Sequence, residues 1–198
     1  MHSSSLDAVK SINIYGHVSA QPEQIAAAFG GTVCKEVDPS CDAAIFVINP
    51  AAGIDNETIE KWRAFDEFQT PRLIAVTVLD GMELDFDDAV MLANRVFDQT
   101  ITPYLVLHGE SGSPIGTISL STLKTTDYST NPPTIAEADE ELIEVVEEFR
   151  DEYLEKIDGM EVGAFAAGII FPAIPLNLVN GLGVDVIQAY LDELPSGS

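Results

Sequence analysis

The part of the chain whose residue types could do chemistry is the segment GHVSAQPE at residues 16–23. A short apolar run, INIY, precedes it, and an apolar helix pattern from Ile25 to Phe29 follows it and ends at two glycines. A glycine turn between a strand and a helix can bind the phosphates of a nucleotide, because backbone N–H groups and the helix N-terminus face the anion. The segment therefore has the architecture of a phosphate-binding loop.

Two side chains within the segment oppose that chemistry. Pro22 has no backbone N–H to offer a phosphate, although it is a favourable first residue for a helix. Glu23 suits the dipole at the helix N-terminus, but its negative charge repels a triphosphate from the same place. We therefore expect an ordinary helix start here and no retained phosphate binding.

The charge balance narrows the classes of partner. The chain has 33 acidic and 9 basic residues and a net charge of −24. Such a surface repels phosphate backbones, so we expect no direct binding to nucleic acid. The two cysteines, Cys34 and Cys41, are not accompanied by other residues at the spacing of metal ligands. This favours a reduced, cytoplasmic protein.

Two further stretches bear on targeting. Residues 162–184 carry no charge, but Pro172, Pro175 and several glycines interrupt them, so we expect a buried helix followed by a strand and no membrane span. The first residues lack a basic region followed by an apolar core. We therefore expect a flexible tail at residues 1–10 and no secretion signal.

The loop at residues 16–23 needs a scaffold, and the residues that follow indicate which one. Residues 43–48 and 73–78 are continuous apolar runs, as in parallel strands covered on both faces. Between them, Asp55 or Asn56 can cap a helix. The apolar stripe of that helix recurs every three residues at Ile59, Trp62, Phe65 and Phe68. A strand, helix and strand in this order form a right-handed crossover, so we expect an α/β fold.

Short motifs occur along this unit in a fixed order. They are Asp42-Ala43-Ala44, Ala51-Ala52-Gly53, Glu57-Thr58, Trp62-Arg63, Pro71-Arg72 and Asp80. In this order and at these spacings the chain resembles the GTPase domain of elongation factor G. The resemblance covers most of residues 11–196. It implies a truncated α/β fold of the P-loop nucleoside triphosphatase type, in which helices cover both faces of a mostly parallel sheet in three layers.

The same resemblance indicates what has been lost. The family's loop reads G-H-[VI]-D-A-G-K-[ST]; Gln21, Pro22 and Glu23 stand here where that pattern has glycine, lysine and the hydroxyl that binds magnesium. Residues 31–37 lead almost directly to Asp42, so the segment that holds both switch regions and the magnesium-coordinating threonine is missing. We expect no metal site and no catalytic residue.

Four residues stand at guanine-binding positions of the family pattern, and of these Asp80 keeps the family's residue. Asp80 falls on the aspartate that bonds guanine, and Thr77 falls on the asparagine three residues before it. Asn177 and Leu178 replace the Ser-Ala pair whose backbone receives the guanine O6. These four residues form the predicted remnant of a guanine pocket. Asp80 alone would contribute about 1.5–3 kcal/mol, less than the about 4 kcal/mol that a Kd of 1 mM requires. The alternative interpretation of Asp80 is a turn residue before Gly81.

The region after Asp80 predicts an elaboration of the domain. Asp85 can cap a helix that ends near Phe97, residues 103–107 predict a strand, and residues 109–123 predict an antiparallel hairpin. By the resemblance, residues 109–159 are an inserted subdomain of antiparallel strands and an acidic helix.

The long acidic helix has its own signals. Residues 134–137 read as a capping box that starts it. Its apolar stripe is predicted to contain Leu142, Val145, Val146, Phe149, Tyr153 and Ile157. The opposite face is rich in glutamate, which indicates either a docking surface for a basic partner or a solvated acidic face. Gly183 and a last helix from Val184 to Leu194 complete the pattern.

We therefore expect a degenerate GTPase-like α/β domain formed by residues 11–108 and 160–196, into which residues 109–159 are inserted. The predicted function is that of an elongation factor G-like pseudo-GTPase that acts as a protein-binding or regulatory module. The alternative is a weak guanine-nucleotide binder of the translation-factor family, with GDP or GTP as ligand. An enzyme of another kind is a third interpretation, but no nucleophile–base pair is legible around the three histidines, His2, His17 and His108.

The missing switch segment also predicts an open sheet edge. The first strand, near residues 12–15, or the segment 31–37 should border solvent or a partner. We expect this edge to be covered by a protein partner, by a second copy of the chain, by the tail or by the helix at Ile25. Association with the ribosome is implied by the family resemblance alone.

Overall fold

The computed structural model describes residues 10–78, 86–97 and 100–195. Its strands are β1 (Ile12–Gly16), β2 (Thr32–Val33), β3 (Ala43–Ile48), β4 (Arg72–Thr77), β5 (Thr100–Ile101), β6 (Tyr104–His108), β7 (Pro114–Ser119), β8 (Lys124–Asp127), β9 (Thr134–Glu137) and β10 (Phe171–Leu176). Its helices are α1 (Pro22–Phe29), α2 (Asn56–Ala64), α3 (Phe86–Val96), α4 (Glu140–Ile157) and α5 (Val184–Asp192), with 3-10 turns η1 (Val18–Ala20) and η2 (Asp66–Phe68).

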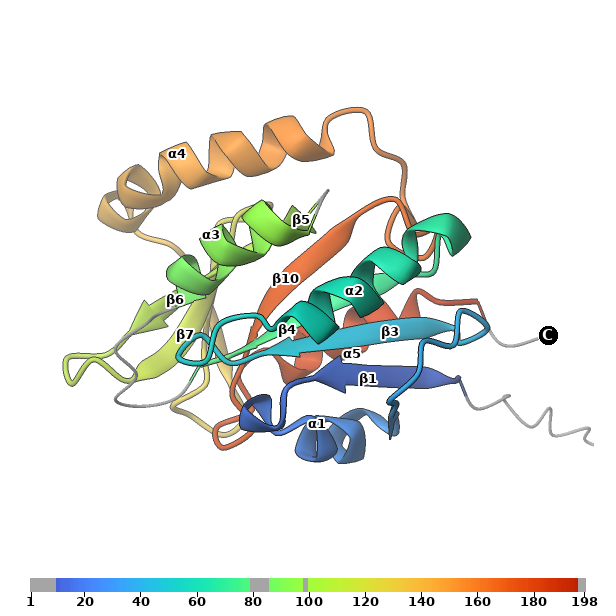
Figure 1. Ribbon diagram of the computed structural model, residues 1–198. Helices are drawn as coiled ribbons and strands as arrows, with labels where there is room; N and C mark the ends of the chain where they lie inside the picture. Colours follow the sequence, from blue (N-terminus) through green and yellow to red (C-terminus); the bar gives the residue numbers. More distant parts are fainter. Residues whose placement is uncertain (1–9, 79–85, 98–99, 196–198) are drawn as a thin grey trace, which may run out of the picture.

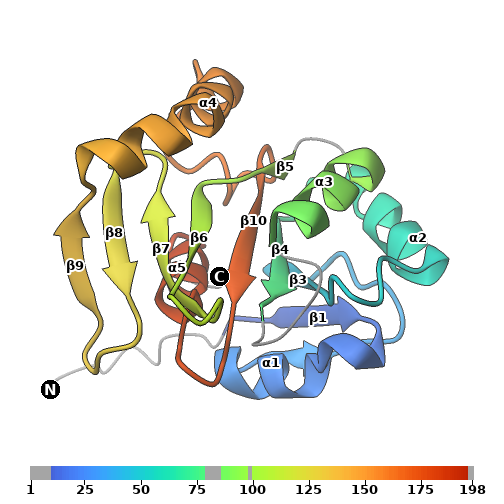
Figure 2. The same cartoon turned by 90° about the vertical axis from the view of Figure 1, so that its left-hand side faces the viewer.

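The larger sheet is parallel and is covered on both faces. It has six strands in the order β2-β1-β3-β4-β10-β5. Helices α2 and α3 pack on one face, and α1 and α5 pack on the other (Figures 1 and 2). The predicted α/β class, with three layers and a parallel sheet, is confirmed.

The central strand–helix–strand unit forms as the sequence predicts. In the parallel register of β3 and β4, Ile45 lies beside Leu73 and Val47 beside Ala75. The Asp55 side chain caps α2 by accepting a hydrogen bond from the Thr58 N–H at 2.7 Å. The expected apolar stripe ends early, because α2 stops at Ala64 and the 3-10 turn that follows leaves Phe68 55% exposed.

A buried arginine connects the elements around this unit. Arg72, at the start of β4, is 1% exposed, and its guanidinium donates to the Trp62 carbonyl at 2.6 Å and to Asp66 at 2.9 Å. The guanidinium carbon lies 4.5 Å from the centroid of the Trp62 ring and 4.3 Å from that of Phe171. Burial lowers the pKa of Arg72, and the bond to Asp66 partly opposes this shift. One side chain thereby joins α2, η2, β4 and β10.

The smaller sheet is antiparallel, with the strand order β6-β7-β8-β9. The predicted hairpin is present, since β6 pairs with β7. Because of this pairing β6 belongs to the smaller sheet, although the boundary predicted at residue 108 places it in the larger unit. The domain boundaries themselves stay a prediction. An apolar cluster of Leu105, Ile118, Leu120 and Val146 attaches this sheet to α4.

The predicted start of the acidic helix is wrong. Thr134–Glu137 is strand β9, and α4 begins at Glu140 with Asp139 as its cap, which accepts from the Leu142 N–H at 2.8 Å. The apolar stripe is also only partly buried. Val146 is 3% exposed, whereas Val145 is 66% and Phe149 is 45% exposed, because the helix covers a narrow four-stranded sheet.

The uncharged stretch near the C-terminus forms turns before a strand. Residues 162–168 form turns in place of the expected helix, and β10 follows as expected. In the described ranges no helix is long and apolar enough to cross a membrane.

Of the two edges of the larger sheet, one is β2, which lies within the predicted edge segment 31–37. Cys34 and Cys41 are free thiols, and burial raises the pKa of Cys41 to about 12.

Gly183 provides a test of the packing between β10 and α5. Its φ is +81°, and a Cβ there would lie 1.8 Å from the Pro175 carbonyl oxygen. We predict that Gly183→Ala lowers the free energy of unfolding by about 3 kcal/mol or more, from left-handed strain of about 1–2 kcal/mol plus the clash. Urea denaturation measures the change. Gly159→Ala is the matched control, because Gly159 has a φ of +72° and no atom within 4 Å of an added Cβ. Equal losses in the two variants would contradict the close approach.

Arg72 provides a second test. We predict that Arg72→Lys lowers the free energy of unfolding by about 2–3 kcal/mol, because an ammonium cannot stack between two rings and bond both Trp62 and Asp66. Arg63→Ala, at an exposed position of the same region, should change it by less than about 0.5 kcal/mol. Denaturation curves that gave the same midpoint for both variants would show that the stack contributes little.

Candidate functional site

The candidate site lies where several parallel strands of the larger sheet end. The loop after β1, the end of β4 and the loop after β10 come together there and surround a cavity of about 60 Å³. The carboxyl ends of parallel strands are the usual place for ligands in α/β sheets. The geometry of the loops therefore decides what this site can hold.

The loop after β1 is closed by its own hydrogen bonds. The Ala20 N–H donates to the His17 carbonyl at 2.9 Å, and the Gln21 N–H donates to the Val18 carbonyl at 3.0 Å. The Ser19 N–H donates to Nδ1 of His17 at 3.2 Å. Three consecutive amides that could face an anion are thus satisfied within a 3-10 turn.

Helix α1 starts directly after this turn. Gln21 has left-handed backbone angles, with φ 55° and ψ 51°, and Pro22 is the first helical residue, as predicted. Glu23 is the acidic residue of the first turn. The Gln24 N–H donates to the Gln21 carbonyl at 3.0 Å. The Gln24 amide at the N-terminus of α1 is therefore bonded within the chain, and the first turn of the helix carries a negative side chain.

The structure brings some of the predicted guanine-pocket residues together. Thr77 and Leu178 both line the 60 Å³ cavity, beside Gln21 and Gln24. The Thr77 hydroxyl donates to the Ile48 carbonyl at 3.2 Å. Asp80 lies outside the described residues.

Asn177 stabilises the loop that follows β10 by hydrogen bonds. Its N–H donates to the Leu182 carbonyl at 2.9 Å, and its side-chain oxygen accepts from the Val179 N–H at 2.9 Å. Asn180 acts in the same way, because its side-chain oxygen accepts from the Leu182 N–H at 3.1 Å. These bonds fix the backbone of the loop without using an external ligand.

One residue of the site is not among those predicted. Asn49, just after β3, donates from its side chain to the Ser19 carbonyl at 3.1 Å, and its oxygen accepts from the Ala51 N–H at 3.0 Å. It therefore holds the first loop against the end of β3. A polar residue directly after a buried strand is the only signal in the sequence that points to it.

The two histidines that the structure describes lie in different surroundings. The His17 ring lies 2.8 Å from the Ser19 hydroxyl and so takes part in the turn. His108 is exposed at the end of β6. In the part of the chain that the structure describes, no group of three or more His, Cys, Asp or Glu side chains is placed to hold a metal ion.

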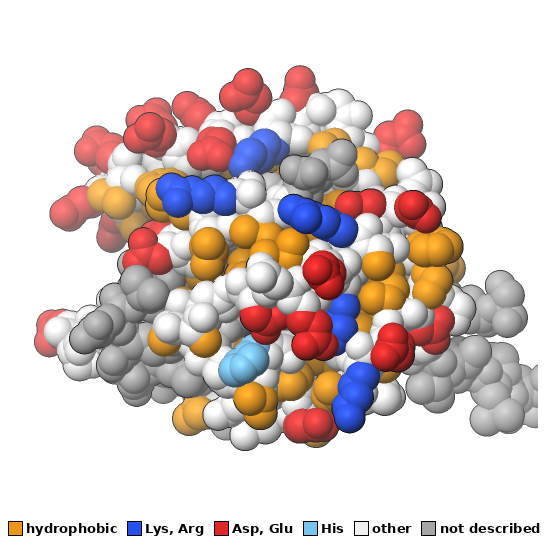
Figure 3. Space-filling view, viewed as in Figure 1, with side chains coloured by type: hydrophobic (Ala, Val, Ile, Leu, Met, Phe, Trp, Pro, Cys, Tyr) orange, Lys and Arg blue, Asp and Glu red, His pale blue; other side chains and the backbone are white. Residues whose placement is uncertain are grey.

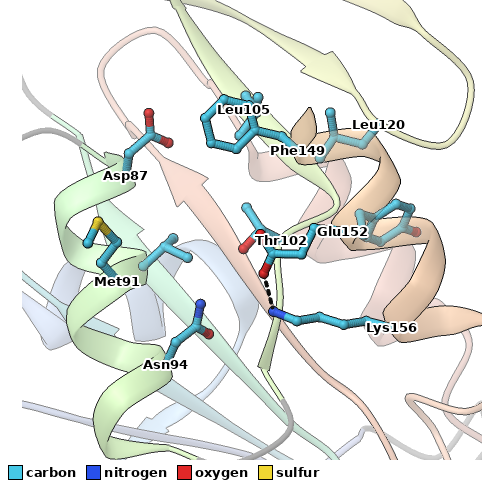
Figure 4. A pocket seen from close by; sticks show the side chains of 11 residues that line it. Asp87, Met91, Asn94, Thr102, Leu105, Leu120, Phe149, Glu152 and Lys156 are labelled. Carbon is cyan, nitrogen blue, oxygen red and sulfur yellow. Dashed lines mark ion pairs between the residues drawn. The ribbon is translucent and has the colours of Figure 1, made fainter. Parts of the chain in front are cut away.

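A separate apolar cavity of about 300 Å³ lies between α3 and α4 (Figure 4). Val90, Leu105 and Phe149 are among its lining residues, and the ion pair of Lys156 with Glu152, at 2.9 Å, lies at its border. The pair is formed one turn apart on α4 and is more than a third exposed, so it contributes little to stability. The apolar part of its lining suits contact with an apolar group.

Comparison with known proteins agrees with the fold and with the family resemblance. No family model matches the chain. It is 23% identical over 168 residues to an elongation factor G-like protein of Thermotoga maritima, a match that covers 76% of the chain and 25% of the relative. It is 28% identical over 179 residues to elongation factor G-like proteins of two strains of Mycobacterium tuberculosis, over 79% of the chain and 25% of the relative. The chain thus spans about a quarter of the length of these relatives.

A solved structure supports the architecture along nearly the whole chain. A crystal structure of a protein from Thermus thermophilus superposes with a TM-score of 0.71 at 18% identity, covering 96% of this chain and 41% of that one. At this identity the match shows the fold. Together the comparisons show that the chain has a fold related to that of the translational GTPases and is similar in sequence to elongation factor G-like proteins.

Proposed function

We propose that the chain is an elongation factor G-like pseudo-GTPase, a scaffold without working phosphate, magnesium and switch motifs that acts as a protein-binding or regulatory module. The observation that carries this proposal is the closed turn after β1. Its amides at Ser19, Ala20 and Gln21 donate to His17 and Val18 of the same loop. A phosphate would have to break these bonds before it could use the same donors.

The charge of the loop also disfavours phosphate binding. Pro22 supplies neither an ammonium group nor an amide, and Glu23 adds a negative charge at the helix N-terminus. A phosphate loop normally gains from its lysine, its hydroxyl-bound magnesium and the helix dipole together. Here the dipole already interacts with Glu23, so little attraction remains for a triphosphate.

The volume of the site also limits what it holds. The cavity of about 60 Å³ lined by Thr77 and Leu178 is far smaller than the about 300–1,000 Å³ of typical ligand pockets. A purine base does not enter it unless the surrounding loops move apart. The loop at residues 177–182 resists such movement, since the Asn177 and Asn180 side chains bond its backbone.

The alternative function is weak binding of a guanine nucleotide. One observation favours it, namely that Thr77 and Leu178 face the same cavity as Gln21 and Gln24. This placement supports the alternative, because a base site beside the loop after β1 would need residues from these same segments. The missing ammonium and magnesium ligands restrict this alternative to an affinity weaker than about 1 mM.

The cellular context follows from the resemblance. A cytoplasmic location and association with the ribosome are part of the proposal, with contact made through protein surfaces. The net charge of −24 opposes direct contact with RNA, because phosphate backbones are repelled by such a surface.

The nucleotide prediction is tested by calorimetric titration of the full chain with GDP and with GTP in the presence of Mg²⁺. We expect no saturable heat at ligand concentrations up to about 1 mM, because the loop amides are already bonded and Glu23 repels the phosphates. Saturable, Mg²⁺-dependent binding with a Kd below about 1 mM would contradict the proposal.

A variant of the loop shows which feature is responsible. The combined changes Gln21→Gly, Pro22→Lys and Glu23→Thr restore the glycine, the ammonium group and the hydroxyl. If this variant binds GDP and the natural chain does not, these three side chains account for the loss. If neither binds, these three side chains do not account for the loss, and the closed turn or the missing switch segment is responsible. Circular dichroism confirms that the variant keeps its fold.

A further inference from the structure

The outer edge of the smaller sheet is an exposed strand. β9 lies at one end of the order β6-β7-β8-β9, and all four of its residues are exposed. Ile135, in the middle of β9, is 67% exposed although it is apolar. A strand that ends a sheet in this way offers unpaired backbone groups to another chain.

The register of β9 shows which backbone groups are free. Ala138 N–H donates to the Leu123 carbonyl, and Ala136 lies opposite Thr125. In an antiparallel pair, bonded and non-bonded positions alternate, so the N–H and C=O groups of Ile135 and Glu137 point away from β8. Along the described chain, no backbone hydrogen bond is formed at these two residues on the outer side. They form a template for one more strand.

A cleft lies directly beside this edge. Its volume is about 790 Å³, and its lining combines Ile135 from β9 with Val179 and Val184 from the larger unit. Val179 is 91% exposed. Two hydrogen bonds hold the two sides of the cleft together. The Tyr128 hydroxyl donates to Asp185 at 2.6 Å, and the Asn180 side chain donates to the Pro114 carbonyl at 3.0 Å. Burial and the bond to Asp185 both raise the pKa of Tyr128, so this donor keeps its proton at neutral pH.

The charge around the β9 edge determines which kind of polypeptide segment can bind there. Several acidic residues lie at or next to it: Glu137 is in β9, Asp139, Glu140 and Glu141 follow β9 in the chain, Asp127 pairs with Thr134, and Asp185 lines the cleft. The nearest cation among the described residues of β8 and β9 is Lys124, which lies 3.7 Å from Glu137. Figure 3 shows that acidic side chains also dominate the surface over α4. A second copy of the chain, with a net charge of −24, would be repelled from this edge.

We propose that the β9 edge and the adjacent cleft bind an extended basic segment of a partner protein as an added antiparallel or parallel strand. Main-chain hydrogen bonds to Ile135 and Glu137 hold the segment. Alternate side chains point to the cleft, where apolar residues contact Ile135, Val179 and Val184, and the others are basic and face the acidic surroundings. The proposal rests on the proposed role as a protein-binding module, but it does not depend on whether a nucleotide binds.

The test uses synthetic peptides of about nine residues, long enough for one strand, titrated against the full chain and followed by fluorescence anisotropy. The probe alternates lysine and valine. One comparison peptide alternates glutamate and valine, and another keeps the lysine–valine sequence with alternate amides N-methylated. We expect the probe to bind at least about tenfold more tightly than either comparison peptide. Equal binding of the N-methylated peptide would overturn the proposal, because charge alone would then explain the affinity.

Variants of the chain locate the binding surface. Ile135→Lys places a cation at the edge and should weaken probe binding at least about tenfold, whereas Val162→Lys, at a fully exposed valine beyond the other end of α4, should leave it unchanged. Hydrogen exchange should show new protection at Ile135 and Glu137 when the probe is bound. Equal loss in the two variants, or no new protection, would overturn the proposal.

The competing occupant gives a different result. If β9 pairs with β9 of a second copy, sedimentation shows a dimer that Ile135→Lys converts to a monomer, and the proposal of a basic partner fails. The outcome for nucleotides is separate, since the calorimetric titration reports on the loop after β1. A chain that binds GDP and also binds the probe would refute the proposed loss of nucleotide binding and leave the β9 site intact.

Discussion

The buried guanidinium of Arg72 is the constraint on which the larger unit depends. A buried cation is costly unless its charge is balanced and its N–H groups are bonded. Here Asp66 supplies the charge, the Trp62 carbonyl accepts a bond, and the rings of Trp62 and Phe171 enclose the planar group. These partners come from α2, η2 and β10, so the arrangement requires all of them to be in place at once. The Arg72 Nε atom is buried without a partner among the described residues, which makes the geometry of the other bonds more important.

The aromatic side chains around Arg72 extend this constraint across the face of the sheet that α2 and α3 cover. Trp62 stacks on Phe97 with a centroid distance of 4.3 Å and meets Phe46 at 4.9 Å. Phe46 in turn stacks on Tyr15 of β1 at 5.1 Å. The strands that carry the site loops are therefore held from one face by a continuous aromatic cluster. The closed turn after β1 follows one of these strands and is held by its own local bonds.

The sequence predicts the larger unit well because its signals are strong and local. Continuous apolar runs of about six residues, such as 43–48 and 73–78, are typical of strands buried on both faces, and Asp55 and Pro22 mark helix starts by their own chemistry. The failures have equally local causes. Residues 134–137 satisfy the pattern of a capping box, yet they pair with β8, and a tertiary contact of this kind is not legible from the segment itself. The role of Arg72 and the tie from Asn49 to Ser19 also depend on residues distant in the chain.

The two units differ in whether their exposed backbone groups are hydrogen-bonded, and this difference bears on function. In the larger unit, the loops that would face a ligand bond themselves, through His17, Asn49, Asn177 and Asn180. In the smaller unit, an apolar residue and two sets of backbone groups remain exposed along β9. Unbonded backbone at an edge is a liability that chains normally suppress. Where the residues around it are acidic, charge opposes association with further copies and favours the basic strand that we propose as its partner. The proposed recognition surface is therefore on the smaller sheet, away from the loops at the ends of the parallel strands.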